Sequence, residues 1–148
     1  MKSRMLFLAL LTSATGFAVA QDSVPEAKPE IAPEIVEANG KIKNRVAEFS
    51  GLDKITGRTI SFDIYVDETV QFGTLQVTPR VCFSRPATET PRTSAFLEVD
   101  EITLDRNIRR IFTGWMFADS PGFNAIEHPV YDVWLKKCKM ESDVAPPS

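Results

Sequence analysis

Histidine and cysteine are scarce in this chain of 148 residues, which contains one His and two Cys. A zinc site takes about four ligands from His, Cys and carboxylates, so this supply makes such a site unexpected. Neither a G-x-S-x-G elbow nor an H-E-x-x-H pair occurs. Lys and Arg number 17 against 20 Asp and Glu, which is not the basic footprint of a nucleic-acid binder. We therefore expect no metal, no cofactor and no nucleic-acid partner.

A long apolar stretch is present only at the N-terminus. Two basic residues precede the apolar run Met5–Leu11, which is too short to span a bilayer, and Ala18-Val19-Ala20 follows as a small-x-small cleavage site. Residues 1–20 therefore have the pattern of a secretory signal peptide, with cleavage before Gln21. We expect a periplasmic protein with no membrane span in its mature chain; a retained N-terminal anchor is the alternative.

The next segment is acidic and rich in proline. Pro25, Pro29 and Pro33 disfavour helix and sheet, and few apolar groups are present to offset the entropy of ordering. We predict that residues 21–40 form an extended, disordered tether, although the repeated P-E spacing is also compatible with a docking motif. Its acidic residues are Asp22, Glu26, Glu30, Glu34 and Glu37.

Residues 41–140 show the two-residue alternation of half-buried β-strands. Turn residues separate the alternating stretches at intervals typical of an antiparallel sheet protein. The sequence predicts an all-β domain, an antiparallel β-sandwich or barrel of about six to seven strands, followed by a disordered tail over residues 141–148. A short helical turn is expected around 120–128. The predicted core faces are Ile60, Phe62, Ile64 and Val66; Leu75, Val77, Val81 and Phe83; and Ala95, Leu97 and Val99.

Cys82 and Cys138 are expected to form a disulfide because export would place them in an oxidising compartment. Simple alternation puts both residues on the side opposite the apolar core positions of their strands. This favours a bridge within one sheet or across a sheet edge over a bridge through the sandwich. A bulge at Pro79 would invert that register.

The stretch GWMFADSPGFNAIEHPVYDVW, residues 114–134, contains both tryptophans and the one histidine. A loop held by a rigid sheet is a common place for function in small β domains. Trp134 lies among charged residues and is either an exposed anchor or a cover for the core or the disulfide. The candidate binding residues are Trp115, Asp119, Phe123, Glu127, His128, Tyr131 and Trp134.

Four segments, LDKITGR (52–58), VQFGTLQVTPRVCF (70–83), FTGWMFADSP (112–121) and EHPVYDVWLKKC (127–138), carry a resemblance. Together they resemble an uncharacterised family of small exported proteins from alphaproteobacteria. The combination GWMFA-SP…EHPVYDVWL…C is specific, and the resemblance extends from about Ala47 to Lys139. It implies export and one compact domain, and it implies no activity.

Three functions remain open from the sequence. We expect a non-catalytic binding or assembly module of the cell envelope, with an unknown envelope protein or polymer as its partner and no residue in a catalytic role. The second is a hydrolase acting on an envelope polymer through Asp119, Glu127 and His128. The third is a structural envelope protein with no ligand. In the structural interpretation of His128, its side chain bonds a loop carbonyl and fixes the entry to the last strand.

Overall fold

The computed structural model describes residues 35–37 and 39–145. The predictions of a signal peptide over residues 1–20 and of disorder over 21–34 therefore lie outside the described residues.

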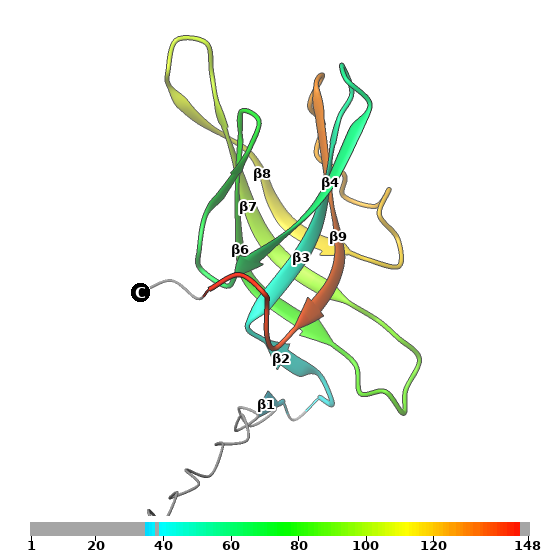
Figure 1. The fold of residues 1–148 in the computed structure, drawn as a ribbon. Helices are drawn as coiled ribbons and strands as arrows, with labels where there is room; N and C mark the ends of the chain where they lie inside the picture. The colour runs from blue at the N-terminus through cyan, green and yellow to red at the C-terminus, as the bar shows by residue number, and fades with distance from the viewer. Residues whose placement is uncertain (1–34, 38, 146–148) are drawn as a thin grey trace, which may run out of the picture. The chain divides into compact units, whose positions relative to one another are not determined.

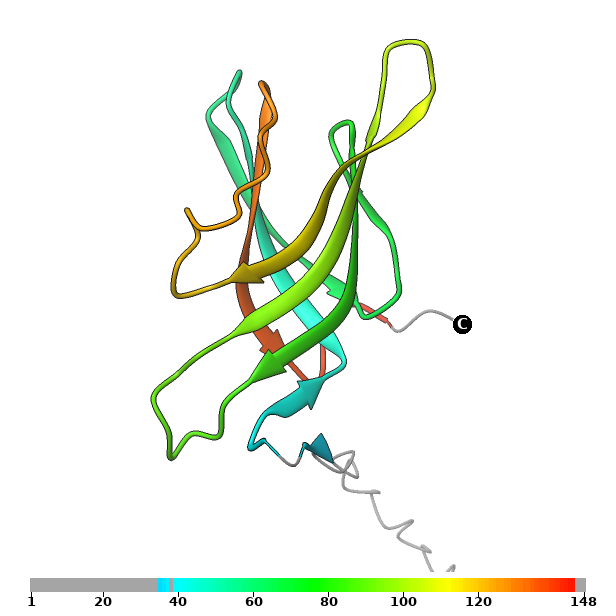
Figure 2. The same ribbon diagram turned by 180° about the vertical axis from the view of Figure 1, so that it is seen from behind.

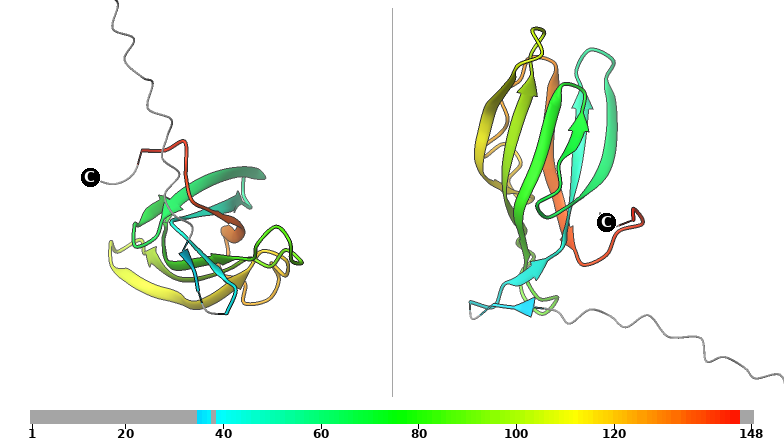
Figure 3. Two further views of the ribbon diagram at one scale, coloured as in Figure 1. Left: turned by 90° about the horizontal axis from the view of Figure 1, so that it is seen from below. Right: turned by 90° about the vertical axis from the view of Figure 1, so that its left-hand side faces the viewer.

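The described residues form two antiparallel sheets packed face to face (Figures 1 and 3). One sheet has the strand order β1-β2-β6-β7-β8, with β5 also paired to β6, and the other has the order β4-β3-β9. The strands are β1 (Ile35–Val36), β2 (Ile42–Asn44), β3 (Val46–Asp53), β4 (Arg58–Tyr65), β5 (Val70–Phe72), β6 (Leu75–Ser84), β7 (Ser94–Ile102), β8 (Ile108–Phe117) and β9 (Tyr131–Lys139).

The predicted fold class is confirmed. Six strands have eight to ten residues, which matches the predicted six to seven, and three further strands have only two or three residues. No helix occurs in the described part of the chain, so the helical turn expected around 120–128 is wrong. That segment instead contains a tight turn, in which the Phe123 N–H donates to the Ser120 carbonyl at 2.9 Å. Asn124 follows in the left-handed region with φ of 57°.

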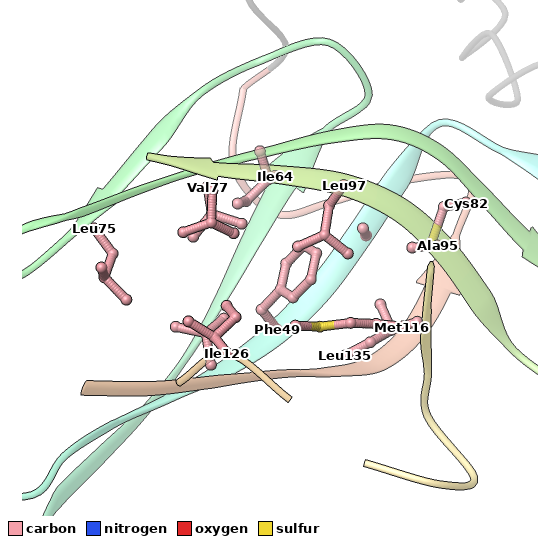
Figure 4. Close-up of a cluster of buried hydrophobic side chains, with 13 residues drawn as sticks. Phe49, Ile64, Leu75, Val77, Cys82, Ala95, Leu97, Met116, Ile126 and Leu135 are labelled. Atoms are coloured by element: carbon pink, nitrogen blue, oxygen red, sulfur yellow. The ribbon is translucent and has the colours of Figure 1, made fainter. Parts of the chain in front are cut away.

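The core lies between the two sheets (Figure 4). Phe49 of β3 and Leu135 of β9 meet Leu97 of β7, and all three are essentially inaccessible to solvent. Residue Ile126 of the long β8–β9 loop also enters this core and is 4% exposed. The core faces predicted for β7 and β4 agree with this packing except at Ile60, which is 41% exposed near the tip of the β3–β4 hairpin.

The disulfide is confirmed, but its predicted placement is wrong. Cys82 of β6 bonds to Cys138 of β9, so the bridge joins the two sheets through the core instead of lying within one sheet. A bulge is the reason in each strand. Pairing with β7 shifts between Pro79 and Val81, and pairing with β3 shifts between Leu135 and Lys137. Each extra residue reverses the alternation, and each cysteine consequently turns inward.

The same bulge in β6 changes the exposure of the residues beside Cys82. Val81 and Phe83 were expected on the core face with Leu75 and Val77. Both are instead partly exposed on the outer face of the six-stranded sheet, whereas Leu75 and Val77 are fully buried. The bulge therefore places the ring of Phe83 on the outer face of the six-stranded sheet.

Two segments outside the predicted domain also make defined contacts. β1 falls within the predicted tether and pairs with β2. After β9 the chain returns beside β4, where the Tyr65 hydroxyl donates to the Val144 carbonyl at 2.8 Å and the Ser142 hydroxyl bonds the Asp63 carboxylate. The first part of the predicted tail is therefore in contact with β4, and residues 146–148 lie outside the described residues.

Candidate functional site

Three aromatic side chains from three adjacent strands gather on the outer face of the six-stranded sheet. The ring of Trp115 in β8 stacks on Phe83 of β6 with centroids 6.2 Å apart and meets Phe96 of β7 edge-on at 5.6 Å. Phe96 and Trp115 are direct cross-strand partners, so their side chains share a face. Trp115 is 37% exposed. We call Phe83, Phe96 and Trp115 the aromatic cluster; its strands lie in front in Figure 2.

A hollow of about 260 Å³ adjoins the aromatic cluster. Phe83 and Phe117 contribute aromatic walls, while Lys41, Arg85 and Arg92 contribute positive charge. The Lys41 ammonium lies 5.4 Å from the centre of the Phe83 ring, within the range of a cation–π interaction. The two arginines flank the β6–β7 loop, which projects at the end of the sandwich opposite the β7–β8 hairpin (Figures 1 and 2). We call this site the basic hollow.

Arg85 differs from the other two cations because its guanidinium is already bonded. It donates to the Asn39 carbonyl at 3.1 Å and lies 3.4 Å from the Glu89 carboxylate. Lys41 and Arg92 form no salt bridge with any described residue. No described carboxylate therefore neutralises these two positive charges.

The same sheet carries ion pairs farther along β6, β7 and β8. Arg80 bonds Glu98 at 2.8 Å and Asp67 at 3.0 Å, and Arg110 bonds Asp100 at 2.5 Å. The hydrogen bonds from Arg80 hold the pKa of Glu98 below its ordinary value, against a smaller opposing effect of burial. Opposite charges neutralise one another at these pairs, in contrast to Lys41 and Arg92 beside the aromatic cluster.

His128 lies where the β8–β9 loop meets β9, and it is 7% exposed. Its Nδ1 accepts hydrogen bonds from the backbone N–H groups of Val130 and Tyr131 at 3.2 and 3.0 Å. These two bonds place the ring proton on Nε2, which lies 3.4 Å from a Glu101 oxygen on β7. The imidazole therefore fixes the start of β9 as an acceptor, whereas the sequence-based interpretation made it a donor to a loop carbonyl.

Two neighbours complete the surroundings of His128. Its ring stacks on Tyr131 with centroids 5.4 Å apart, and its carbonyl accepts a bond from the Lys54 ammonium at 2.8 Å. Hydrogen bonding by Arg109 is the largest influence on Glu101 and lowers the pKa of that carboxyl, with a smaller contribution from His128. This cluster links the two sheets and their loops, and both of its ring nitrogens are engaged by protein groups.

Trp134 faces away from the core and is half-buried. It lies on β9 opposite Ser50 of β3, in the three-stranded sheet. Together with Asp132 and part of the β8–β9 loop, including Pro121 and Ala125, it lines a shallow hollow of about 250 Å³. The two tryptophans thus belong to different sheets, and Trp134 is neither a core residue nor a fully exposed anchor.

A buried carboxylate on the three-stranded sheet is surrounded by lysines. Glu48 is 8% exposed and lies 3.0, 3.2 and 3.3 Å from the ammonium groups of Lys136, Lys137 and Lys139. Burial by itself raises the pKa of Glu48, but the hydrogen bonds from the three lysines outweigh it and lower the pKa from 4.5 to about 2. The ionised carboxylate therefore stabilises the pairing of β3 with β9.

Replacing Glu48 with Gln tests this assignment. Because the folded pKa lies below the unfolded value, the carboxylate stabilises fully above pH 4.5 and loses this contribution as the pH falls toward 2. We expect Glu48→Gln to lower the free energy of unfolding by about 1–2 kcal/mol at pH 7, allowing for solvent screening of the lysines. Urea unfolding across this pH range should show a shallower pH dependence in the variant. Parallel curves would contradict the assignment.

The seven candidate residues do not meet at one site. Trp115 joins the aromatic cluster, and Phe123, 61% exposed, contacts Phe117 at 5.9 Å beside the basic hollow. The remaining candidates are His128 with Tyr131 between the sheets, Trp134 on the other sheet, and Asp119 and Glu127, which are exposed on the loop. Within the described residues, neither Asp119 nor Glu127 has a side-chain hydrogen bond or salt bridge to His128.

Sequence reasoning missed six aromatic and cationic residues of the aromatic cluster and the basic hollow: Phe83, Phe96, Phe117, Lys41, Arg85 and Arg92. Phe83 was predicted in the core because simple alternation along the sequence does not include the bulge in β6. Phe96 lies between the buried residues Ala95 and Leu97, and the alternation of β7 therefore turns it to the outer face. The cations come from segments outside residues 114–134, and only the sheet order β2-β6-β7-β8 brings them together.

Comparison with known proteins shows the family of this chain. Residues 47–138 match the family described as "Uncharacterized protein conserved in bacteria (DUF2155)". The chain belongs to this family. The uncharacterized protein RP359 of Rickettsia prowazekii (strain Madrid E) is 25% identical over 100 residues, which are 68% of this chain and 60% of that protein. The match therefore spans less than two thirds of that relative. No solved structure matches.

The family match supports the resemblance to an uncharacterised bacterial family. The restriction of that family to alphaproteobacteria stays a prediction. In the part of the chain that the structure describes, no group of three or more His, Cys, Asp or Glu is arranged to hold a metal ion. That part also has no helix long and apolar enough to cross a membrane.

Proposed function

We propose that this protein is a non-catalytic binding module of the bacterial periplasm, and that the outer face of its six-stranded sheet contacts an envelope protein or polymer. The observation that carries the proposal is Trp115, which is 37% exposed and held between Phe83 and Phe96 on a sheet face that no described segment covers with a further layer. Contiguous exposed apolar surface marks interaction sites, and tryptophan is one of the residues enriched in interface hot spots.

The disulfide supports export. A disulfide between Cys82 and Cys138 fits an oxidising compartment such as the periplasm, and the N-terminal sequence has the pattern of a cleaved signal peptide. Export and envelope location are therefore part of the proposal.

The geometry gives the hydrolase hypothesis no support. A general base needs a free nitrogen or oxygen near its substrate, and both nitrogens of His128 face protein groups in a buried position. Asp119 and Glu127 lie exposed on the loop, and neither they nor His128 line the hollow beside Trp134. The third hypothesis, a structural protein with no ligand, is separated from ours by the experiment below.

The two tryptophans give a matched pair of variants for that experiment. Mature protein immobilised on beads is incubated with detergent-solubilised envelope extract, and the bound material is compared among wild type, Trp115→Ala and Trp134→Ala. We expect Trp115→Ala to reduce specific capture by tenfold or more, since truncating a hot-spot tryptophan costs about 2 kcal/mol or more of binding free energy. Trp134→Ala should retain capture.

Thermal unfolding of both variants is the control, with capture carried out well below either midpoint. Loss of capture in Trp134→Ala but not in Trp115→Ala would place the binding surface on the three-stranded sheet and contradict the proposal. Absence of any specific capture by the wild type would favour the structural protein without a ligand.

A further inference from the structure

The basic hollow has a composition that the proposed function does not by itself require. Its walls include the half-buried rings of Phe83 and Phe117, and its charged side chains are all positive: Lys41, Arg85 and Arg92. Lys43 lies beside it as the cross-strand partner of Phe83, on the same sheet face. An apolar site with cations at its edge is complementary to an apolar group that carries negative charge nearby.

The charge of this site is opposite to that of the whole chain. The chain has a formal net charge of −3, whereas Lys41, Lys43 and Arg92 form no salt bridge with a described residue. Glu89 pairs with Arg85 alone. The other arginines of this sheet that lie near acids, such as Arg80 and Arg110, are paired. Six described Lys and Arg side chains form no salt bridge, and three of them, Lys41, Lys43 and Arg92, thus lie together at the hollow; the other three are Arg45, Arg58 and Arg106.

The hollow continues into the aromatic cluster. Phe83 belongs to both, because it lines the hollow and stacks on Trp115 at 6.2 Å. A ligand lying along this surface would therefore meet cations at one end and exposed aromatic rings at the other. We infer that the hollow and the cluster bind an acidic polypeptide segment, with its carboxylates at Lys41, Lys43 and Arg92 and its apolar side chains against Phe83, Phe117 and Trp115. This inference rests on the proposed function.

A polypeptide fits this surface better than a bilayer does. Phe83, Phe96 and Phe117 are only partly exposed, and Arg85 and Arg92 lie at the base of a projecting loop, so a flat membrane surface would meet the loop before the rings. The most exposed aliphatic side chains lie elsewhere. Leu104, at 102% exposure, and Ile55, at 77%, occupy hairpin turns at the opposite end of the sandwich.

Fluorescence anisotropy with a labelled short peptide of alternating Glu and Phe tests the inference on the mature protein. We expect saturable binding that weakens at least fivefold when Gln replaces every Glu. The double variant Lys41→Ala with Arg92→Ala should weaken binding tenfold or more, and raising NaCl from about 50 to about 500 mM should weaken it as well, because salt screens exposed charges. Arg109→Ala is the matched control, since Arg109 pairs with Glu101 at 2.6 Å near the β7–β8 turn; its affinity should equal that of wild type.

Equal affinity for the Glu and Gln peptides, or no effect of the double variant, would overturn the inference. Membrane binding in place of peptide binding would also overturn the inference. In that outcome, the peptide fails to bind, and vesicles of phosphatidylglycerol and phosphatidylethanolamine co-sediment with wild type but not with the double variant. If Trp115→Ala loses capture from envelope extract and the Glu peptide does not bind, the choice of ligand is wrong and the proposed function stands. If the peptide binds as expected but Trp115→Ala keeps full capture from envelope extract, the proposed role of Trp115 in contacting the envelope partner is wrong.

Discussion

Replacing both cysteines, Cys82→Ser with Cys138→Ser, is expected to lower the free energy of unfolding by about 4 kcal/mol. The disulfide closes a loop with a sequence separation of 56 residues and so removes much of the entropy of the unfolded chain. It also joins β6 of one sheet to β9 of the other across the core. Because small domains are stable by only about 5–15 kcal/mol, this loss would be a large fraction of the total.

Urea unfolding of the oxidised wild type and of the double variant measures this difference. The wild type in reducing buffer is the control, and it should unfold at nearly the same urea concentration as the double variant. A change below about 1 kcal/mol, the effect of an average point substitution, would show that the bridge does not hold the sheets together.

His128→Ala is expected to lower the free energy of unfolding by about 3 kcal/mol. The substitution removes the acceptor of two backbone N–H groups, those of Val130 and Tyr131. His128 itself is buried and only 7% exposed. A buried donor left without a partner costs about 1–3 kcal/mol, and these two N–H groups are partly buried. The stacking of the imidazole on Tyr131 is lost as well.

Asn at this position is the matched control. An Asn carbonyl can accept bonds from backbone N–H groups two and three residues ahead, as the imidazole Nδ1 does, but it cannot reproduce the contact of Nε2 with Glu101. We therefore expect His128→Asn to restore much of the stability lost in His128→Ala. Equal destabilisation of the two variants would mean that the Glu101 contact or ring packing dominates. A stable His128→Ala protein would contradict the structural role.

Alternation was sufficient to predict the strands whose pairing is regular. In β7, Ala95, Leu97 and Val99 are all buried as expected, and the whole domain is antiparallel as the turn spacing indicated. The errors in β6 and β9 arose at bulges. One extra residue in β6 and one in β9 reverse the side chains that follow, so Phe83 moves out and both cysteines move in. A bulge depends on the partner strand, and a single sequence does not reveal the partner.

The candidate site was predictable only in part for a related reason. Residues 114–134 form one stretch of sequence, but they run from β8 of one sheet through a loop to β9 of the other. Trp115 and Trp134 are therefore separated by the fold although they are close in sequence. The residues that join Trp115 are distant in sequence: Phe83 and Phe96 are its contacts because β6, β7 and β8 are neighbours. Strand order, which the sequence left open, determines the composition of the surface.

In-cell photocrosslinking tests the central claim most directly. A photoreactive benzoylphenylalanine is placed at position 115 in one protein and at position 134 in another, and each is expressed with the native N-terminus in a host that contains the natural envelope. We expect irradiation to give discrete higher-mass adducts from position 115 and few or none from position 134, because only Trp115 belongs to the aromatic cluster. Adducts from position 134 with none from position 115, or equal yields from both, would contradict the assignment of the binding surface to the six-stranded sheet.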